Sequence, residues 1–295
     1  MSHSGAVGPC ALPNTASGKR RVAAALAIVV VLLSGCSTAP PAPAGTAGEQ
    51  SFGHVHGLGI DPADNGLYVA SHMGVFKQTR DGFERIADRW QDTMAFTVVG
   101  PDHFLASGHP DMREDKPVHL GLIESKDAAE TWESLSLEGR ADFHVLEPAG
   151  ERLYGYDSQT QSLMVTSDRR EWQDLVRLPV VDLAADPNDA DSLMITDTSG
   201  RLMRMQGGRQ PQLVTDAPRL VFIDWHEEGL LVGLGPDGSV YRSTDGTASW
   251  QELRSLEEPP EALAVTTDAW YAATGHGIYV SQDQGRTWSS VDGTQ

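Results

Sequence analysis

Two histidines stand one residue apart in the segment SFGHVHGLGI, residues 51–60. The segment reads as a β-strand, in which alternate residues point to the same face, so His54 and His56 should lie about 7 Å apart along it. Neutral imidazoles are common ligands of zinc and copper. Any half-buried strand can carry this spacing, so the pair becomes informative only if further ligands lie nearby.

Further nitrogen and sulfur donors occur in other short, glycine-containing stretches. His72 lies in VASHMGVF, His109 in SGHPDM and His276 in ATGHGIY. Methionine thioethers, which favour Cu(I) over zinc, accompany two of them at Met73 and Met112. Whether these side chains reach the first two histidines depends on the fold that positions them.

A repeat of about forty residues runs along the chain. The segments SKDAAETW, TSDRREW, STDGTASW and SQDQGRTW share the order Ser/Thr-x-Asp, a short turn and tryptophan, while TRDGFERI and RMQGGRQ look like degraded copies. Successive copies are 46, 41, 38, 39 and 38 residues apart, counted between Asp81, Asp127, Asp168, Gln206, Asp245 and Asp283. Short strand-like stretches bounded by turn residues surround each copy. Such a period predicts a propeller or a solenoid.

The repeated motif resembles the Asp-box, or BNR repeat, of sialidases, sortilin-type receptors and photosystem assembly factors. The resemblance covers nearly all of the chain after residue 51. It implies an all-β fold, a six-bladed β-propeller with Asp-box repeats, in which the motif is structural and its tryptophan packs between blades. A seventh blade is possible but would require a repeat that the sequence does not display. The expected blades span about residues 52–93, 94–141, 142–180, 181–218, 219–259 and 260–291.

A propeller would gather the histidines at one face. The first strand of each blade lines the central channel, and the turn between the second and third strands lies at the face where that strand enters. We therefore expect a transition-metal site for copper or zinc. Its candidate ligands are His54, His56, His72, His109, His276, Met73 and Met112. The alternatives are histidines hydrogen-bonded around a wet channel, and a substrate pocket in which they act as acid, base or donor.

Carboxylates suited to hydrolysis are few. Chains with HVHGLGID and GHPD-type turns resemble bacterial lipoproteins loosely labelled glycosyl hydrolases, and most glycosidases need a carboxylate pair. Only Asp142 and Glu261, which align with His56 in the repeat, suggest such a pair. The Arg-Ile-Pro segment of sialidases is missing from the sequence. A hydrolase is therefore the second hypothesis and a protein-interaction scaffold the third, and the balance is against an enzyme.

The N-terminal segment predicts export and a lipid anchor. Three basic residues precede an apolar run, residues 22–33, that is shorter than the roughly twenty residues needed to span a bilayer. The run ends in Leu-Ser-Gly-Cys, which resembles a bacterial lipobox and implies acylation of Cys36. We expect a signal peptide over residues 1–35, a lipidated flexible tether rich in Pro, Ala and Gly over 36–51, and the propeller domain over 52–295.

The net charge and the cysteine content limit which partners the chain can bind and which bonds it can form. Removal of the three basic signal residues leaves 22 − 3 = 19 Lys and Arg against 41 Asp and Glu, a formal charge of 19 − 41 = −22. This balance argues against nucleic acid and favours cations. Only Cys10 and Cys36 are present, so the domain has no thiol for a disulfide. We expect an extracytoplasmic, membrane-anchored lipoprotein at the cell surface or in the periplasm, with a metal ion or small ligand, no nucleotide cofactor and a protein partner possible.

Overall fold

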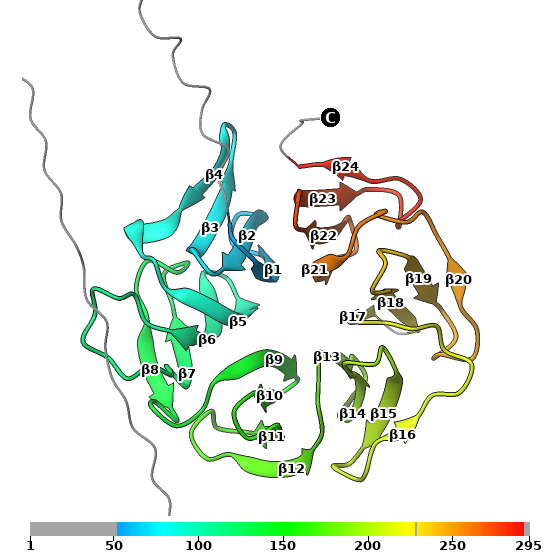
Figure 1. Cartoon of the computed structure of the whole chain (residues 1–295), viewed down its shortest axis with the longest axis horizontal. Helices are drawn as coiled ribbons and strands as arrows, with labels where there is room; N and C mark the ends of the chain where they lie inside the picture. The colour runs from blue at the N-terminus through cyan, green and yellow to red at the C-terminus, as the bar shows by residue number, and fades with distance from the viewer. Residues whose placement is uncertain (1–51, 228, 292–295) are drawn as a thin grey trace, which may run out of the picture. The chain divides into compact units, whose positions relative to one another are not determined.

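Six four-stranded antiparallel sheets form a ring in the computed structural model, which describes residues 52–227 and 229–291 (Figure 1). Each sheet uses four strands that are consecutive in the sequence. The all-β, six-bladed propeller predicted from the repeat is confirmed. The predicted signal peptide (residues 1–35), tether (36–51) and Cys36 lie outside the described residues. Over the part of the chain that is described, no helix is long and apolar enough to cross a membrane.

The strands are short, as a forty-residue repeat requires. Blades 1 and 2 comprise β1 (Val55–Asp61), β2 (Gly66–Ser71), β3 (Gly74–Thr79), β4 (Gly82–Arg85), β5 (Asp92–Gly100), β6 (His103–His109), β7 (Leu122–Ser125) and β8 (Glu133–Ser136). Blades 3 and 4 comprise β9 (Phe143–Ala149), β10 (Arg152–Asp157), β11 (Ser162–Thr166), β12 (Gln173–Arg177), β13 (Asp182–Asp186), β14 (Asp189–Thr196), β15 (Leu202–Gln206) and β16 (Gln212–Leu213). Blades 5 and 6 comprise β17 (Phe222–Glu227), β18 (Leu230–Leu234), β19 (Val240–Ser243), β20 (Gln251–Glu252), β21 (Pro260–Val265), β22 (Trp270–Thr274), β23 (Gly277–Ser281) and β24 (Ser289–Ser290).

The hydrophobic core lies between the blades. Between blades 2 and 3, for example, Leu105 and Leu122 pack against Phe143 and Leu146, and Trp172 covers them from the rim. Because a neighbouring blade covers each face of a sheet, second strands such as β2 are apolar and buried on both faces instead of alternating. Blade 1 at the N-terminal end and blade 6 at the C-terminal end pack in the same way, which closes the ring.

The repeated Ser/Thr-x-Asp turns join the third and fourth strands of their blades, as predicted. In the turn after β7, Asp127 Oδ1 accepts a hydrogen bond from the Thr131 backbone N–H at 2.9 Å. The same bond recurs at 2.9 Å in the turn after β23, where Asp283 accepts from Thr287. These carboxylates stabilise the turns that carry the packing tryptophans.

A second set of hydrogen bonds ties each blade to the preceding one. At every interface one backbone N–H donates to a side-chain oxygen of the blade before it, at 2.8–3.1 Å. The donor–acceptor pairs, in ring order, are Asp102–Asp61, Phe143–Ser107, Ala185–Glu147, Ile223–Asp182, Val265–Asp224 and Val55–Glu261. The last pair joins residues 206 positions apart and links blade 6 to blade 1.

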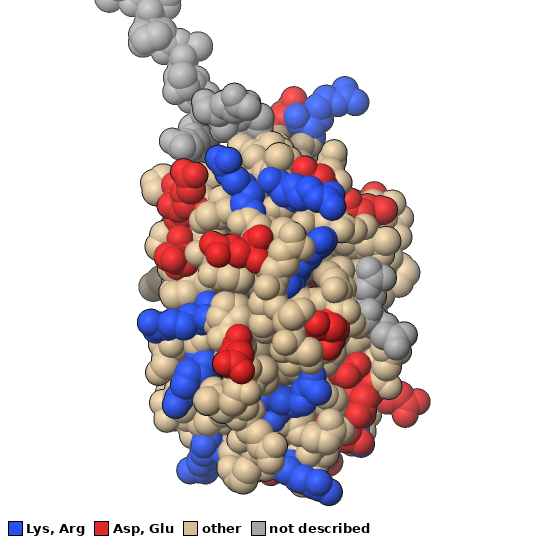
Figure 2. Space-filling model, turned by 90° about the vertical axis from the view of Figure 1, so that its right-hand side faces the viewer, with Lys and Arg blue, Asp and Glu red and all other residues tan. Residues whose placement is uncertain are grey.

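Charged side chains of both signs cover one flank of the ring. The side formed by the blades on the right of Figure 1 carries interspersed Lys, Arg, Asp and Glu (Figure 2). On this flank the acidic excess of the chain is therefore not gathered into one patch, and no extended basic stripe of the kind that binds nucleic acid is visible there.

Removal of a packing tryptophan should loosen one interface. The Trp172 ring lies 4.6 Å from that of Phe143, and its Nε1–H donates to Ser136 Oγ at 2.9 Å. We expect Trp172→Ala to lower the free energy of unfolding by about 3 kcal/mol, the lower end for large aromatic truncations, because the side chain is half-buried. Urea denaturation followed by circular dichroism measures this loss. Trp90, 43 % exposed, is the control and should cost about 1 kcal/mol or less when truncated; equal losses would contradict the assignment.

Candidate metal centre

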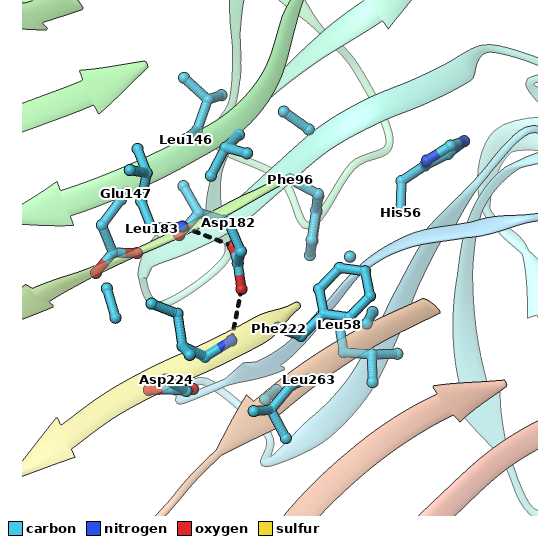
Figure 3. Close-up of a pocket in the computed structure, with 18 of the residues that line it drawn as sticks. His56, Leu58, Phe96, Leu146, Glu147, Asp182, Leu183, Phe222, Asp224 and Leu263 are labelled. Carbon is cyan, nitrogen blue, oxygen red and sulfur yellow. Dashed lines mark hydrogen bonds between the residues drawn. The ribbon is translucent and has the colours of Figure 1, made fainter. Parts of the chain in front are cut away.

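The inner strands surround a cavity of about 170 Å³ on the axis of the ring. Figure 3 shows His56 at one side of it and three acidic side chains, Glu147, Asp182 and Asp224, at the other. Burial raises the pKa of Asp182 to about 7 and that of Asp224 to about 6, and it raises the pKa of Glu147 as well. Each keeps some surface open to the cavity, yet the surrounding protein removes much of its hydration. The cavity is therefore lined by carboxyl groups that stay protonated to a higher pH than carboxyl groups in water.

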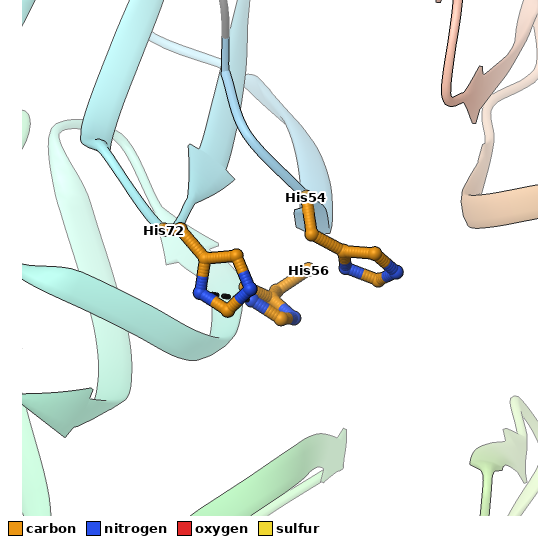
Figure 4. A group of neighbouring side chains, drawn as sticks. All are labelled: His54, His56 and His72. Carbon is orange, nitrogen blue, oxygen red and sulfur yellow. Dashed lines mark hydrogen bonds between the residues drawn. The ribbon is translucent and has the colours of Figure 1, made fainter.

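Three histidines converge beside this cavity on blade 1. His54 and His56 flank the first residue of β1, and His72 lies in the turn between β2 and β3 (Figure 4). A backbone hydrogen bond from His72 N–H to the His54 carbonyl, 3.1 Å long, holds the turn against the strand. One ring nitrogen from each histidine lies within 4.8 Å of the others. The predicted association of His54, His56 and His72 is thus present.

The spacing of the three rings suits a single ion. Their centroids are 4.5, 4.8 and 5.8 Å apart. His56 Nε2 and His72 Nδ1 are separated by 3.3 Å. Two nitrogens bound to one tetrahedral zinc ion lie about 3.3 Å apart, since each Zn–N bond measures about 2.0–2.1 Å. The third nitrogen, on His54, lies within 4.8 Å of its partners, so its ring would have to move toward the ion.

Burial differs among the three imidazoles. The side chains of His54 and His72 are 49 % and 44 % exposed, whereas that of His56 is 11 % exposed. Burial, helped by the neighbouring His72 and His54, lowers the pKa of His56 to about 3. His56 is therefore neutral at physiological pH, which is the form that binds metals. The two exposed histidines leave the group open to an ion from solution.

Two carboxylates adjoin the histidines. Asp92, the first residue of β5, lies 2.9 Å from His72 Nδ1 and 3.8 Å from His56 Nε2. Glu261 lies 3.9 Å from His54 Nε2 through one oxygen, while its other oxygen accepts the N–H of Val55. Asp92 contacts the same Nδ1 of His72 that faces His56, so an ion bound between the two rings would replace this hydrogen bond and have the carboxylate within reach. Sequence reasoning missed Asp92, which stands at a strand start and belongs to no recognisable motif.

The remaining predicted ligands lie elsewhere. His276 Nδ1 is 2.8 Å from Glu258, and its side chain is 76 % exposed. Met73 packs against the apolar interface between blades 6 and 1, and Met112 is fully exposed on a loop. His276 is not part of the three-histidine group that the described residues form. A shared position in the turn of a repeat is therefore not enough to bring a side chain to the channel mouth.

His109 belongs to a second group, on blades 2 and 3. Ring nitrogens of His109 and His119 and a carboxylate oxygen of Asp142 lie within 4.8 Å of one another. His119, which reads as a surface residue in the sequence, is only 26 % exposed. Its position ten residues after His109, at the other end of the same loop, is the sequence feature that could have revealed it.

The two candidate catalytic carboxylates serve different groups. Asp142 of blade 3 lies near His144 of the same blade and near His109 and His119 of blade 2, whereas Glu261 lies on blade 6 beside His54. Blades 3 and 6 are opposite in a ring of six. The structure therefore provides no support for their acting as a glycosidase pair.

Comparisons with known proteins support the propeller fold. No family model matches the chain, and no curated protein is similar to it in sequence. Similar solved structures include a nidogen/laminin complex, with a TM-score of 0.60 and 9 % sequence identity over 76 % of this chain and 92 % of that one. YCF48 bound to D1 peptide has a TM-score of 0.51 and 14 % identity over 82 % of this chain and 83 % of that one. Virginiamycin B lyase from Staphylococcus aureus has a TM-score of 0.54 and 11 % identity over 81 % of this chain and 84 % of that one. At such low identities the likeness establishes the fold and not the activity.

The raised pKa values in the cavity predict a pH dependence of stability. Between about pH 4 and pH 7 the folded chain keeps the Asp182 proton that the unfolded chain has already released, so this group stabilises the fold less as the pH rises. The stability of the parent relative to Asp182→Asn should therefore fall by at least about 1 kcal/mol across that range. Urea denaturation of both proteins at a series of pH values measures it. A difference that stays constant or grows with pH would contradict the raised pKa.

Proposed function

We propose that this protein is an extracytoplasmic lipoprotein whose propeller binds a transition metal, zinc or copper, through His54, His56 and His72. The observation that carries the proposal is the convergence of three imidazole nitrogens within 4.8 Å at the end of the channel. Neutral imidazole is a usual ligand of both metals. The exposed edges of His54 and His72 leave the ion a coordination position for water or a further ligand.

The donor set favours divalent ions. Because Met73 packs on the apolar core and Met112 is exposed on a loop, neither of the two predicted thioethers favours Cu(I) at the histidine group. Asp92 and Glu261 each lie within 4 Å of an imidazole nitrogen, and their negative charge favours a cation at this position. Three imidazoles with an open fourth position suit Zn²⁺ and Cu²⁺.

A related proposal concerns the class and the role of the repeated turns. Their Ser/Thr-x-Asp bonds and packed tryptophans support assignment to the Asp-box class. We infer that these turns are structural, because they join third and fourth strands, whereas the histidines lie on a first strand and a second-to-third turn.

Titration of the metal-free protein tests the metal proposal. Changing both His54 and His56 to alanine should weaken Zn²⁺ and Cu²⁺ binding at this position by 100-fold or more, since even outer-shell partners contribute roughly 10- to 100-fold. Isothermal titration calorimetry on protein without a histidine tag measures the affinities. Asp92→Asn should give an intermediate loss, because it removes a carboxylate that contacts His72 but leaves all three imidazoles in place.

His226→Ala is the matched control for this titration. His226 lies on the inner strand of blade 5, where its ring nitrogen is 3.1 Å from Thr267 Oγ1, and it belongs to neither histidine group. Its removal should leave both affinities unchanged. Equal binding by the parent and the His54/His56 double variant would leave these histidines as channel lining and refute the metal proposal.

The lipid anchor gives a separate prediction. Changing Cys36 to alanine should remove the acylation site, so the protein should appear in the soluble fraction or accumulate unprocessed. Detergent phase partitioning of parent and variant measures the difference. If both partition into detergent alike, the anchor proposal is wrong, while the metal proposal is unaffected.

A further inference from the structure

A loop between β6 and β7 brings two more imidazoles close together. The Leu120 N–H donates to the Gly108 carbonyl at 2.9 Å, which closes the base of the loop and sets His109 opposite His119. Their rings are 5.5 Å apart. A further bond at 3.2 Å, from the Gly121 N–H to the Ala141 carbonyl, holds this base against blade 3, directly before Asp142.

Asp142 completes this group with a buried carboxylate. The residue is only 2 % exposed. Its Oδ2 accepts from Ser158 Oγ at 3.0 Å and from Gln159 Nε2 at 3.3 Å, and it lies 3.2 Å from His144 Nε2. Although burial raises it, the hydrogen bond and charge of His144, together with Ser158, lower the pKa of Asp142 below its usual range. The side chain is therefore a fixed anion.

Two polar atoms at the centre of this group have no hydrogen-bond partner. Asp142 Oδ1 and His119 Nδ1 are both buried and unpaired. A buried polar atom without a partner costs about 1–3 kcal/mol, so native proteins rarely retain one without a reason. An ion bound between the two atoms would satisfy both.

His109 directs a lone pair to the same place. Its Nδ1 is 2.9 Å from the Val118 carbonyl, an acceptor that places the ring proton on Nδ1 and the lone pair on Nε2. Nε2 is 3.9 Å from Asp142 Oδ1, and His119 Nδ1 is 3.9 Å from Asp142 Oδ2. These distances are too long for hydrogen bonds. They exceed the separation of about 3.3 Å between two ligands of a tetrahedral ion by about 0.6 Å, so the side chains would have to close around an ion.

We propose that His109, His119 and Asp142 form a second metal site, with the chemistry of two imidazoles and one carboxylate, for a divalent ion such as Zn²⁺. This donor set is typical of zinc sites that keep one position open. The carboxylate makes the site less suited to Cu(I) than the three-histidine group is. The second site does not depend on the first, because the two groups share no ligand.

One strand pair nevertheless connects the two sites. Asp92 and His109 are directly opposite each other in the register of β5 and β6. Asp92 contacts His72 of the three-histidine group, while His109 contributes to the second. His56 and His144 also line the same cavity. Two cations bound this close repel each other, so occupation of one site should weaken binding at the other.

Metal stoichiometry of four variants tests the second site. We expect the metal-free parent to take up two Zn²⁺ ions per chain in native mass spectrometry, His54→Ala/His56→Ala one, His109→Ala/Asp142→Asn one, and the fourfold variant none. Co²⁺ absorption spectra of the two double variants should differ, since one retains three imidazoles and the other two imidazoles with a carboxylate. His226→Ala should still bind two ions.

The outcomes separate the two proposals. If the His54/His56 variant binds no ion, or the His109/Asp142 variant binds as many as the parent, the second site is refuted and a water molecule bridges the unpaired atoms instead. If the His109/Asp142 variant binds one ion fewer than the parent while the His54/His56 variant binds as many as the parent, the second site stands and the first proposal fails. His109→Ala alone, a side chain 32 % exposed, repeats the test if Asp142→Asn disturbs folding, which circular dichroism reports.

Discussion

The ring depends on hydrogen bonds that tie the innermost strand of a blade, which has one edge without a partner strand, to the blade before it. Only between blades 1 and 2 does the donor, Asp102, lie outside the innermost strand. At each interface an oxygen of the preceding blade accepts a backbone N–H from the next one, and in five of the six the acceptor is a carboxylate. Unpaired strand edges are otherwise open to wrong pairings. These bonds also determine where each blade sits on its neighbour. The raised pKa values of Asp182 and Asp224 are the electrostatic cost of this arrangement.

The histidine groups are built on the same interfaces. Glu261 holds the N–H of Val55, the residue between His54 and His56, so the bond that joins blade 6 to blade 1 also positions two imidazoles. Asp142 starts blade 3, where Phe143 is held by Ser107 of blade 2. Ligands placed by a backbone that is fixed on both sides lose little freedom when they bind an ion. Both groups therefore have the rigidity that a metal site requires.

The repeat made the fold predictable, whereas the sites required more than periodicity. Six copies of one turn predicted six blades, and the position of His54, His56 and His72 within blade 1 predicted their association. His276 has the same place in its repeat as His72, yet it lies beside Glu258, because the direction of a turn side chain depends on local contacts. Asp92 and His119 escaped notice because their positions follow from strand register and loop closure, neither of which the sequence displays.

The order of the strands bears on how the ring is made. Every sheet pairs strands that follow one another along the chain, so a blade can complete its hydrogen bonds within about forty residues. The entropy cost of closing such short loops is small. The contact between blades 6 and 1 is different, because it must wait for the last repeat. Until then Val55, Leu67 and Phe76 expose an apolar face of blade 1. Such a surface invites aggregation in an incomplete chain, so we expect ring closure to limit the yield of folding.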